Sequence, residues 1–136
     1  LSALINKKIT YWVVSKLFKI IKNIKKPRIL ILGVAYKKNI DDVRESPALK
    51  IMEILAKKKI LFQYYDPYVR ELPRNRNYYK NIKSIKISPK RIKSFNAIIL
   101  VTDHDVINWG MIQKNAKLIL DTRNVYKKKY DNVIKS

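Results

Sequence analysis

Apolar side chains recur every three or four residues between residues 3 and 26, while lysines and a serine occupy the opposite positions. The apolar positions are Ile9, Val13, Leu17, Ile20 and Ile24. This period predicts an amphipathic helix, and Pro27 ends it because the residue before a proline disfavours helical backbone angles. A basic amphipathic helix can lie on a membrane, but more often its apolar face packs on its own protein.

Four later segments are continuous runs rich in β-branched, leucine and aromatic residues. They cover residues 28–35, 60–66, 97–103 and 117–122. All four are interpreted as strands, and the run at residues 28–35 is typical of a strand that is covered on both faces, as in parallel sheets. Residues 82–88 predict one more short strand, residues 67–81 are irregular, and residues 126–136 predict a short helix or a frayed end.

Helical segments separate the strands. Ser46 can cap the first of them, and Pro47 suits its opening turn. A short helix begins at Ser88 and Pro89, and residues 106–114 form a helix or a turn. Strands that alternate with helices predict a three-layer, Rossmann-like α/β domain with a mainly parallel sheet.

We expect two parts in the chain: a helical segment at residues 1–27, and the Rossmann-like domain at residues 28–136. A length of 136 residues suits one domain. Because the sequence opens at Leu1 inside a predicted helix, we interpret it as a piece of a longer polypeptide.

The amino-acid composition excludes several kinds of functional site. There is no cysteine, which excludes disulfides, thiolate metal sites and a thiol nucleophile within this chain. The single histidine, His104, cannot form a zinc site alone, and we expect no metal. No apolar run approaches the roughly 18 residues of a membrane span, and no secretory signal is evident. We therefore expect a soluble, cytoplasmic protein without membrane contact.

The formal net charge of +21 suggests a polyanionic partner. Lysine and isoleucine are both abundant while glycine is rare, however, and a bias toward A- and T-rich codons gives the same skew. The lysines are also scattered along the chain rather than gathered into one run. Nucleic acid is for these reasons the weaker interpretation.

Five charges crowd the loop after the first predicted strand. They are Lys37, Lys38, Asp41, Asp42 and Arg44. In such a fold, ligands bind at the carboxyl ends of the strands, and this loop runs into a helix N-terminus, which favours phosphate. Asp41 and Asp42 could hold Lys37 and Arg44 in place. We expect Asp66, Asp103, His104 and Arg123 to converge there, although a charged loop can also be merely solvated.

Four motifs carry a resemblance to a known family. In order, they are "LGVAYKKNIDDVRESPALKIMEIL", "YYDPYV", "AIILVTDHDVINW" and "AKLILDTRNV". Together they resemble the C-terminal, UDP-binding domain of the UDP-glucose/GDP-mannose dehydrogenase family, and the first looks most like the UDP-N-acetylglucosamine 6-dehydrogenase branch. The preceding "TYWVVSKLFKIIKNIKKPRILILG" is similar to the end of the long helix that joins the two halves of such enzymes and carries their dimer contact.

The resemblance implies an enzyme that oxidises C6 of a UDP-sugar to a carboxylate, with two hydride transfers to NAD, for polysaccharide precursor synthesis. The catalytic cysteine and most of the NAD site belong to an N-terminal domain that precedes this segment. The chain would then contribute no catalytic residue and would be inactive alone. Its expected partners are the UDP-sugar, that N-terminal domain and a second copy of the protein, which would meet it through the connecting helix.

The motifs also imply roles for single residues. Tyr36 and Lys37 would contact UDP, and Arg123 would add a second positive contact on the substrate side. Arg44 would reach NAD, and Asp42 would fix the loop. Asn39 stands where an acidic residue is common in the family, which implies one charge fewer and a looser loop.

Two other functions remain open from the sequence. A basic nucleic-acid-binding module would use the Arg- and Tyr-rich residues 68–80, where Tyr78 and Tyr79 could stack on bases. Alternatively, the chain is an inactive remnant of the dehydrogenase. We interpret His104 as a hydrogen-bonding loop residue rather than a general base, and Trp12 and Trp109 as packing residues.

Overall fold

Strands and helices alternate along the part of the chain that the computed structural model describes, residues 3–72 and 82–136. The helices are α1 (Ala3–Ile21), α2 (Pro47–Lys57), α3 (Pro89–Lys93) and α4 (Trp109–Asn115). The strands are β1 (Arg28–Leu32), β2 (Leu61–Tyr65), β3 (Ala97–Leu100), β4 (Ile119–Asp121) and β5 (Val133–Lys135). The predicted α/β class is confirmed.

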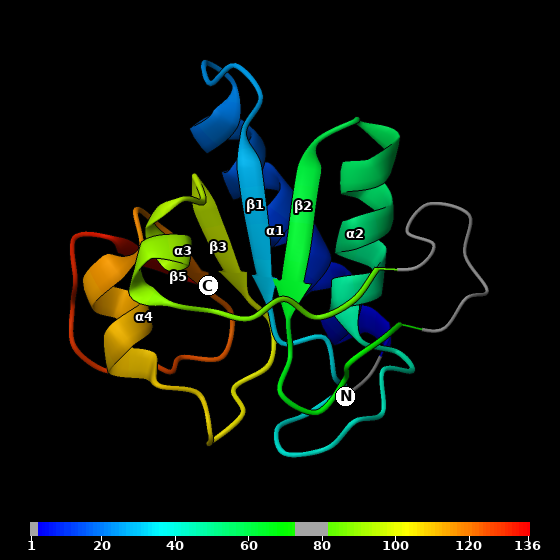
Figure 1. The fold of residues 1–136 in the computed structure, drawn as a ribbon. Coiled ribbons are helices and arrows are strands. Elements are labelled where there is room, and N and C mark those ends of the chain that lie inside the picture. Colours follow the sequence, from blue (N-terminus) through cyan, green and yellow to red (C-terminus); the bar gives the residue numbers. More distant parts are fainter. Residues whose placement is uncertain (1–2, 73–81) are drawn as a thin grey trace.

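The strands of the described residues form one parallel sheet in the order β2-β1-β3-β4-β5. The order reverses between β1 and β3, because β2 lies on one side of β1 and all later strands lie on the other. α1 and α2 cover one face of the sheet, and α3 and α4 cover the opposite face (Figure 1). The chain therefore has the predicted three-layer, Rossmann-like architecture.

Alternate residues of β1 enter two different hydrophobic cores. Ile29 and Ile31 pack with α1 and α2, whereas Leu30 and Leu32 belong to the core under α3 and α4. All four side chains are fully buried. Burial on both faces explains why the strand is an unbroken apolar run in the sequence.

Several elements are shorter than predicted: β3 ends at Leu100, and β4 covers only Ile119–Asp121. α1 ends at Ile21 rather than residue 26, and the helix cannot continue to Pro27 because Lys26 has a left-handed backbone (φ 55°). β1 ends at Leu32, because Gly33 leaves the strand conformation with φ 84°.

Two segments differ in kind from the prediction. Residues 82–88 form only an isolated bridge between Glu71 and Lys83, because the Ser84 hydroxyl hydrogen-bonds the backbone of Asp66 in place of a strand ladder. The tail is not a helix or a frayed end; its β5 pairs with β4. Tyr78 and Tyr79, with residues 73–81, lie outside the described residues.

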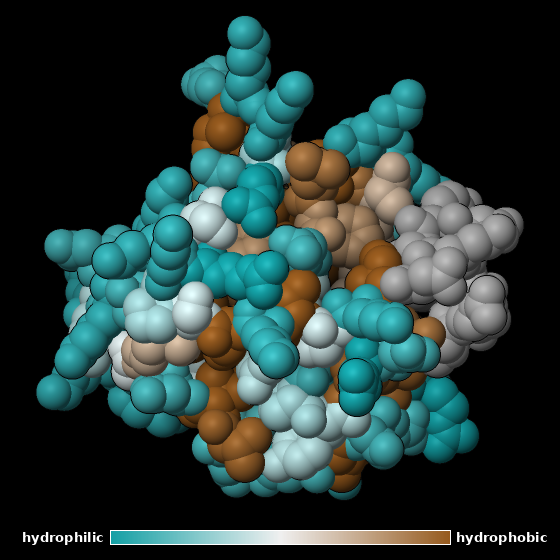
Figure 2. Space-filling model, in the orientation of Figure 1, coloured by the Kyte–Doolittle hydropathy of each residue, from teal (hydrophilic) through white to brown (hydrophobic). Residues whose placement is uncertain are grey.

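The surface in Figure 2 is mostly hydrophilic, with smaller hydrophobic areas between the polar side chains. Exposed lysines occur on α1, on α2 and in the tail, so the positive charge is spread over the molecule. Among the helices of the described residues, none is long and apolar enough to cross a membrane.

We expect Ser46→Ala to lower the free energy of unfolding by about 1 kcal/mol, because a helix cap is lost. The buried Ser46 Oγ accepts a hydrogen bond from the Ala48 backbone N–H at 3.2 Å, at the start of α2. Urea unfolding measures the change. Ser46→Thr keeps the acceptor oxygen, so an equal loss in that variant would contradict the capping explanation.

Candidate functional site

The loops after β1 and β3 meet at the carboxyl edge of the sheet, beside the point where the strand order reverses (Figure 1). Ligands of parallel α/β sheets bind at this type of crevice. The two backbones approach closely here, since a Cβ on Gly33 would lie 2.6 Å from the Thr102 carbonyl oxygen. Residues 36–45 follow β1 and lead into the N-terminus of α2.

Residues 36–45 form a closed loop in which two of the three cations are tied to acids. The Tyr36 N–H donates to the Asp42 carbonyl at 2.7 Å and closes the loop. The Arg44 guanidinium donates to both Asp42 carboxylate oxygens, the shorter bond being 2.8 Å, and Lys38 Nζ lies 3.7 Å from Asp105. Lys37 is exposed and makes no ion pair with any described residue.

Asp42 therefore holds Arg44 and fixes the loop, as predicted, whereas the predicted acidic partner for Lys37 is not found among the described residues. The hydrogen bonds from the Arg44 side chain and backbone N–H lower the pKa of Asp42 to about 2. At neutral pH this carboxylate stays ionised and keeps its cation. The side chain of Lys37 remains available to an anionic ligand.

Arg123 joins the loop to the ends of two strands. Its Nε donates to the Val101 carbonyl at 2.9 Å, and one Nη donates to the Tyr36 carbonyl at 3.0 Å. The other Nη lies 3.8 Å from an Asp103 carboxylate oxygen. A guanidinium has five N–H donors, so Arg123 still has hydrogens to offer a ligand. Tyr36, Lys37 and Arg123 consequently lie at one edge of the molecule.

Asn39 links the loop after β1 to the loop after β3. Its side-chain amide donates to Asp105 Oδ2 at 2.7 Å, and its side-chain oxygen accepts the Asp105 backbone N–H at 3.0 Å. The Asn39 backbone N–H donates to His104 Nδ1 at 2.8 Å. The expectation of a looser loop at Asn39 is wrong, because three hydrogen bonds hold this residue.

A buried pair lies beneath this link. His104 Nε2 is 2.9 Å from Asp66 Oδ2, and both side chains are inaccessible to solvent. Burial alone raises the pKa of Asp66, but hydrogen bonds from His104, Val34 and Tyr68 outweigh it and leave the pKa below its ordinary value. The predicted convergence of Asp66, Asp103, His104 and Arg123 is confirmed, in two layers: the His104–Asp66 pair below, and Arg123 with Asp103 above.

Arg44 shares a cavity with one of the other predicted site residues, Tyr36. The Arg44 side chain is 86% exposed and lies with Tyr36, Asp42 and Glu45 around a cavity of about 400 Å³.

Asp105 is the residue that sequence reasoning missed. Its position two residues after Asp103, at a strand end, was a usable signal, but its partners Lys38 and Asn39 are distant in sequence.

We expect Asn39→Asp to weaken the link between the loops, because two carboxylates would face each other where an amide now donates. The pKa of Asp105, which the Asn39 amide and the Lys38 charge hold below its ordinary value, should rise. Carboxyl NMR titration measures this change. Asn39→Gly, the control, tolerates the φ of 65° and removes only the side-chain bonds. A pKa of Asp105 no higher in Asn39→Asp than in this control would contradict the repulsion.

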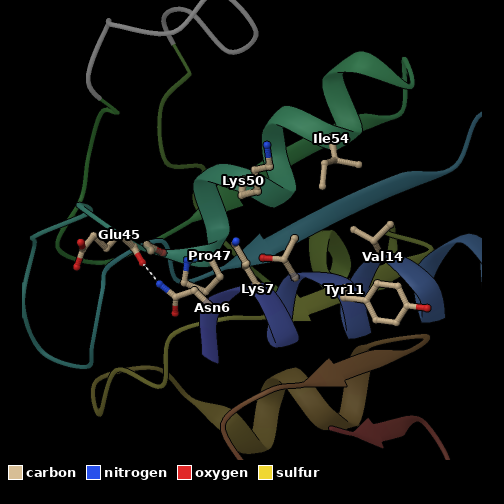
Figure 3. A pocket seen from close by; sticks show the side chains of 10 residues that line it. Asn6, Lys7, Tyr11, Val14, Glu45, Pro47, Lys50 and Ile54 are labelled. Carbon is tan, nitrogen blue, oxygen red and sulfur yellow. Dashed lines mark hydrogen bonds between the residues drawn. The ribbon is translucent and has the colours of Figure 1, made fainter. Parts of the chain in front are cut away.

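A second cavity of about 560 Å³ lies between α1 and the start of α2 (Figure 3). Val14, Pro47 and Ile54 supply apolar walls, and Lys7 and Lys50 stand at its sides. The Asn6 side-chain amide donates to the Glu45 carbonyl and ties α1 to the end of the charged loop. This cavity therefore adjoins the Arg44 end of the site.

Known proteins resemble the chain over nearly its whole length. Residues 30–128 match the UDP-binding domain of the UDP-glucose/GDP-mannose dehydrogenase family. A UDP-N-acetyl-D-mannosamine dehydrogenase of Methanococcus vannielii is 31% identical over 132 residues, which are 89% of this chain and 29% of that protein. A UDP-glucose 6-dehydrogenase of Rickettsia prowazekii is 32% identical over 108 residues, 76% of this chain and 25% of that protein.

A solved structure shares the fold. The UDP-D-ManNAc dehydrogenase of Pyrococcus horikoshii superposes with a TM-score of 0.71 at 33% identity, covering 96% of this chain and 31% of that one. The chain thus spans less than a third of the length of these relatives.

Proposed function

Because the chain belongs to the UDP-glucose/GDP-mannose dehydrogenase family, we propose that it is the nucleotide-sugar-binding portion of an NAD-dependent UDP-sugar 6-dehydrogenase. In this proposal the remainder of the enzyme is an N-terminal domain that supplies the cysteine and most of the NAD site. The product, a UDP-linked uronate, would serve the synthesis of polysaccharide precursors in the cytoplasm. This chain alone would be inactive, since it contains no cysteine.

The observation that carries the proposal is the exposed Lys37 beside Tyr36 and Arg123 at the strand-order reversal. A diphosphate at this edge would find one full positive charge that no described acid neutralises. The remaining guanidinium hydrogens of Arg123 would add a second cation, only 19% exposed and so already fixed in place. Charge-assisted hydrogen bonds to such preorganised donors are strong.

Arg44 is the residue that we assign to NAD. Its guanidinium is exposed and is oriented by both oxygens of Asp42, so it can reach a group held by another domain. NAD would accept hydride from the sugar, and Arg44 would contribute binding rather than chemistry. The cavity of about 560 Å³ beside Glu45 would lie at the junction with the N-terminal domain.

The connecting helix offers a surface for a second copy of the enzyme. Leu4, Ile5 and Tyr11 on α1 are 63%, 45% and 77% exposed, although each is apolar or aromatic. Covering such side chains is favourable. We propose that residues 1–27 form this dimer contact, and that residues 28–136 form the UDP-sugar-binding domain.

The identity of the hexose stays a prediction. The sequence motifs favour UDP-N-acetylglucosamine, while two of the relatives are named for UDP-N-acetyl-D-mannosamine and one for UDP-glucose. All of these share the UDP group, and the residues assigned here would bind that shared part. The sugar would be chosen mainly by the rest of the enzyme.

We expect Lys37→Ala to weaken UDP binding to the intact enzyme about tenfold or more, since a charge-assisted hydrogen bond is lost. Arg123→Ala should weaken it further, because it also releases the Tyr36 and Val101 carbonyls. Isothermal calorimetry measures both affinities.

The matched control is Lys93→Ala. This variant also removes one lysine charge, but at the end of α3. The next residue, Ser94, accepts a hydrogen bond from Arg28 at the start of β1, so Lys93 lies at the edge of the sheet opposite the candidate site. Its UDP affinity should equal that of the unmodified enzyme. If Lys37→Ala and Arg123→Ala also leave the affinity unchanged, the site assignment is wrong.

A further inference from the structure

His104 is fully buried and bridges two elements that the UDP site needs. Its Nδ1 accepts the backbone N–H of Asn39 at 2.8 Å, so Nδ1 carries a lone pair. The proton of the neutral ring is therefore on Nε2, which donates to Asp66 Oδ2 at 2.9 Å. The imidazole therefore connects Asp66, which follows β2, to Asn39 in the loop after β1 by two hydrogen bonds.

We propose that His104 is a positioning residue for nucleotide binding: its unprotonated Nδ1 holds the backbone at Asn39, and protonation of that atom releases the loop and lowers nucleotide affinity. The His104 side chain is inaccessible to solvent, so in this proposal it contacts neither substrate nor cofactor. It acts through Asn39 on Lys37, two residues earlier in the same loop. This inference rests on the proposed function only for its affinity measurement.

The groups around His104 explain why protonation of the ring affects its hydrogen bond with Asn39 and not the one with Asp66. Asp66 faces Nε2 and keeps its hydrogen bond to either form of the ring. The edge of the Tyr68 ring packs at 4.9 Å between centroids and supplies no acceptor to Nδ1. Among the described residues, the hydrogen bond recorded at Nδ1 is the one from the Asn39 N–H, and the neighbouring Lys38 pairs with Asp105. The Trp109 indole N–H binds the His104 carbonyl, which fixes the backbone.

A proton on Nδ1 would place two donors face to face at a distance of 2.8 Å. The Asn39 bond cannot survive this arrangement, because neither atom then has a lone pair to share. Three carboxylates lie beside the ring: Asp66 binds Nε2, and Asp103 and Asp105 flank His104 in the chain. The loop is therefore held while Nδ1 is unprotonated and released when Nδ1 binds a proton.

The lone histidine makes the first test direct. Nitrogen-15 NMR of the 136-residue chain should show the Nε2–H tautomer at neutral pH. On acidification, the Asn39 amide signal should shift together with protonation of the ring. An Nδ1–H tautomer at neutral pH, or an Asn39 amide that does not follow the ring, would overturn the proposal whether or not the chain binds UDP.

Two conservative variants provide the second test, with UDP-glucose as the probe because both of its phosphates stay ionised in mild acid. The side-chain oxygen of His104→Asn lies near the Nδ1 position and can still accept the Asn39 N–H. The amide of His104→Gln lies near Nε2 and can keep only the Asp66 bond. In the intact enzyme, His104→Asn should retain affinity and lose its dependence on His104 protonation.

His104→Gln should bind UDP-glucose about five- to tenfold more weakly at neutral pH, the usual effect of one lost hydrogen bond. The unmodified enzyme should reach the same weak affinity in acid. Equal affinities of His104→Gln and the unmodified enzyme across this pH range would overturn the inference. If no form binds UDP-glucose, the proposed function fails, and the NMR experiment still decides the role of His104.

Discussion

Replacing Gly33 with alanine is expected to lower the free energy of unfolding by about 3–5 kcal/mol. The added Cβ would lie 2.5 Å from Thr102 Cβ and 2.6 Å from the Thr102 carbonyl oxygen, both too close for any real contact. The backbone at Gly33 also has φ 84°, which L-residues other than glycine rarely adopt. Because Thr102 belongs to the loop after β3, the clash would separate the two loops that form the site.

Urea unfolding gives the change in free energy, and calorimetry with UDP gives the change in binding. Gly110→Ala is the matched control, since the nearest atom to its added Cβ would be 3.6 Å away and the residue lies in α4. Alanine should be neutral or slightly stabilising there. A loss in Gly33→Ala no larger than that in Gly110→Ala would refute the close approach of β1 and β3.

The sequence predicts the sheet well because burial dictates composition there. Each long strand has apolar residues on both faces, so Ile29 and Leu30 had to be apolar for different cores. The cap at Ser46 was equally visible, since serine is a preferred N-cap and Pro47 suits the first helical turn. These features can be predicted because they depend on residues that are close together in the sequence.

The errors arise where distant contacts decide the structure. β5 is only Val133–Lys135, too short to show a pattern, and it forms because β4 presents a free edge and the Asn132 carbonyl accepts the Ile119 N–H. Residues 82–88 have strand-like composition, yet Ser84 binds the backbone at Asp66 and replaces the ladder. Neither partner could be identified from the local sequence.

The convergence of side chains at the strand ends was predicted, but the pairing between these side chains was not. Strand ends had to converge, and Arg123 does reach the Tyr36 carbonyl. Which acid would hold which cation depends on loop geometry, and Asp105 rather than Asp41 proved to be the partner of a lysine. The bridging role of His104 was equally hidden, because Asn39 and Asp66 are brought to it only by the fold.

Asp66→Asn is the variant with the other large expected effect, a loss of about 3–5 kcal/mol in the free energy of unfolding. The backbone N–H groups of Val34, Tyr68 and Val69 all donate to this carboxylate. An asparagine offers one acceptor oxygen, and its NH2 group would face further donors in a buried site. Urea unfolding measures the loss, and Asp131→Asn, an exposed carboxylate, should change little.

The same carboxylate should make stability depend on pH. The folded pKa of Asp66 is lowered, so its contribution is complete above the unfolded pKa of about 4 and disappears as the pH falls through the folded value. The unmodified protein should therefore lose stability in acid more steeply than Asp66→Asn, and the two unfolding free energies should approach each other there. Parallel curves for the two proteins would mean that the carboxylate is not held by its donors, and the bridge from Asp66 through His104 to the loop of residues 36–45 would then have no fixed end.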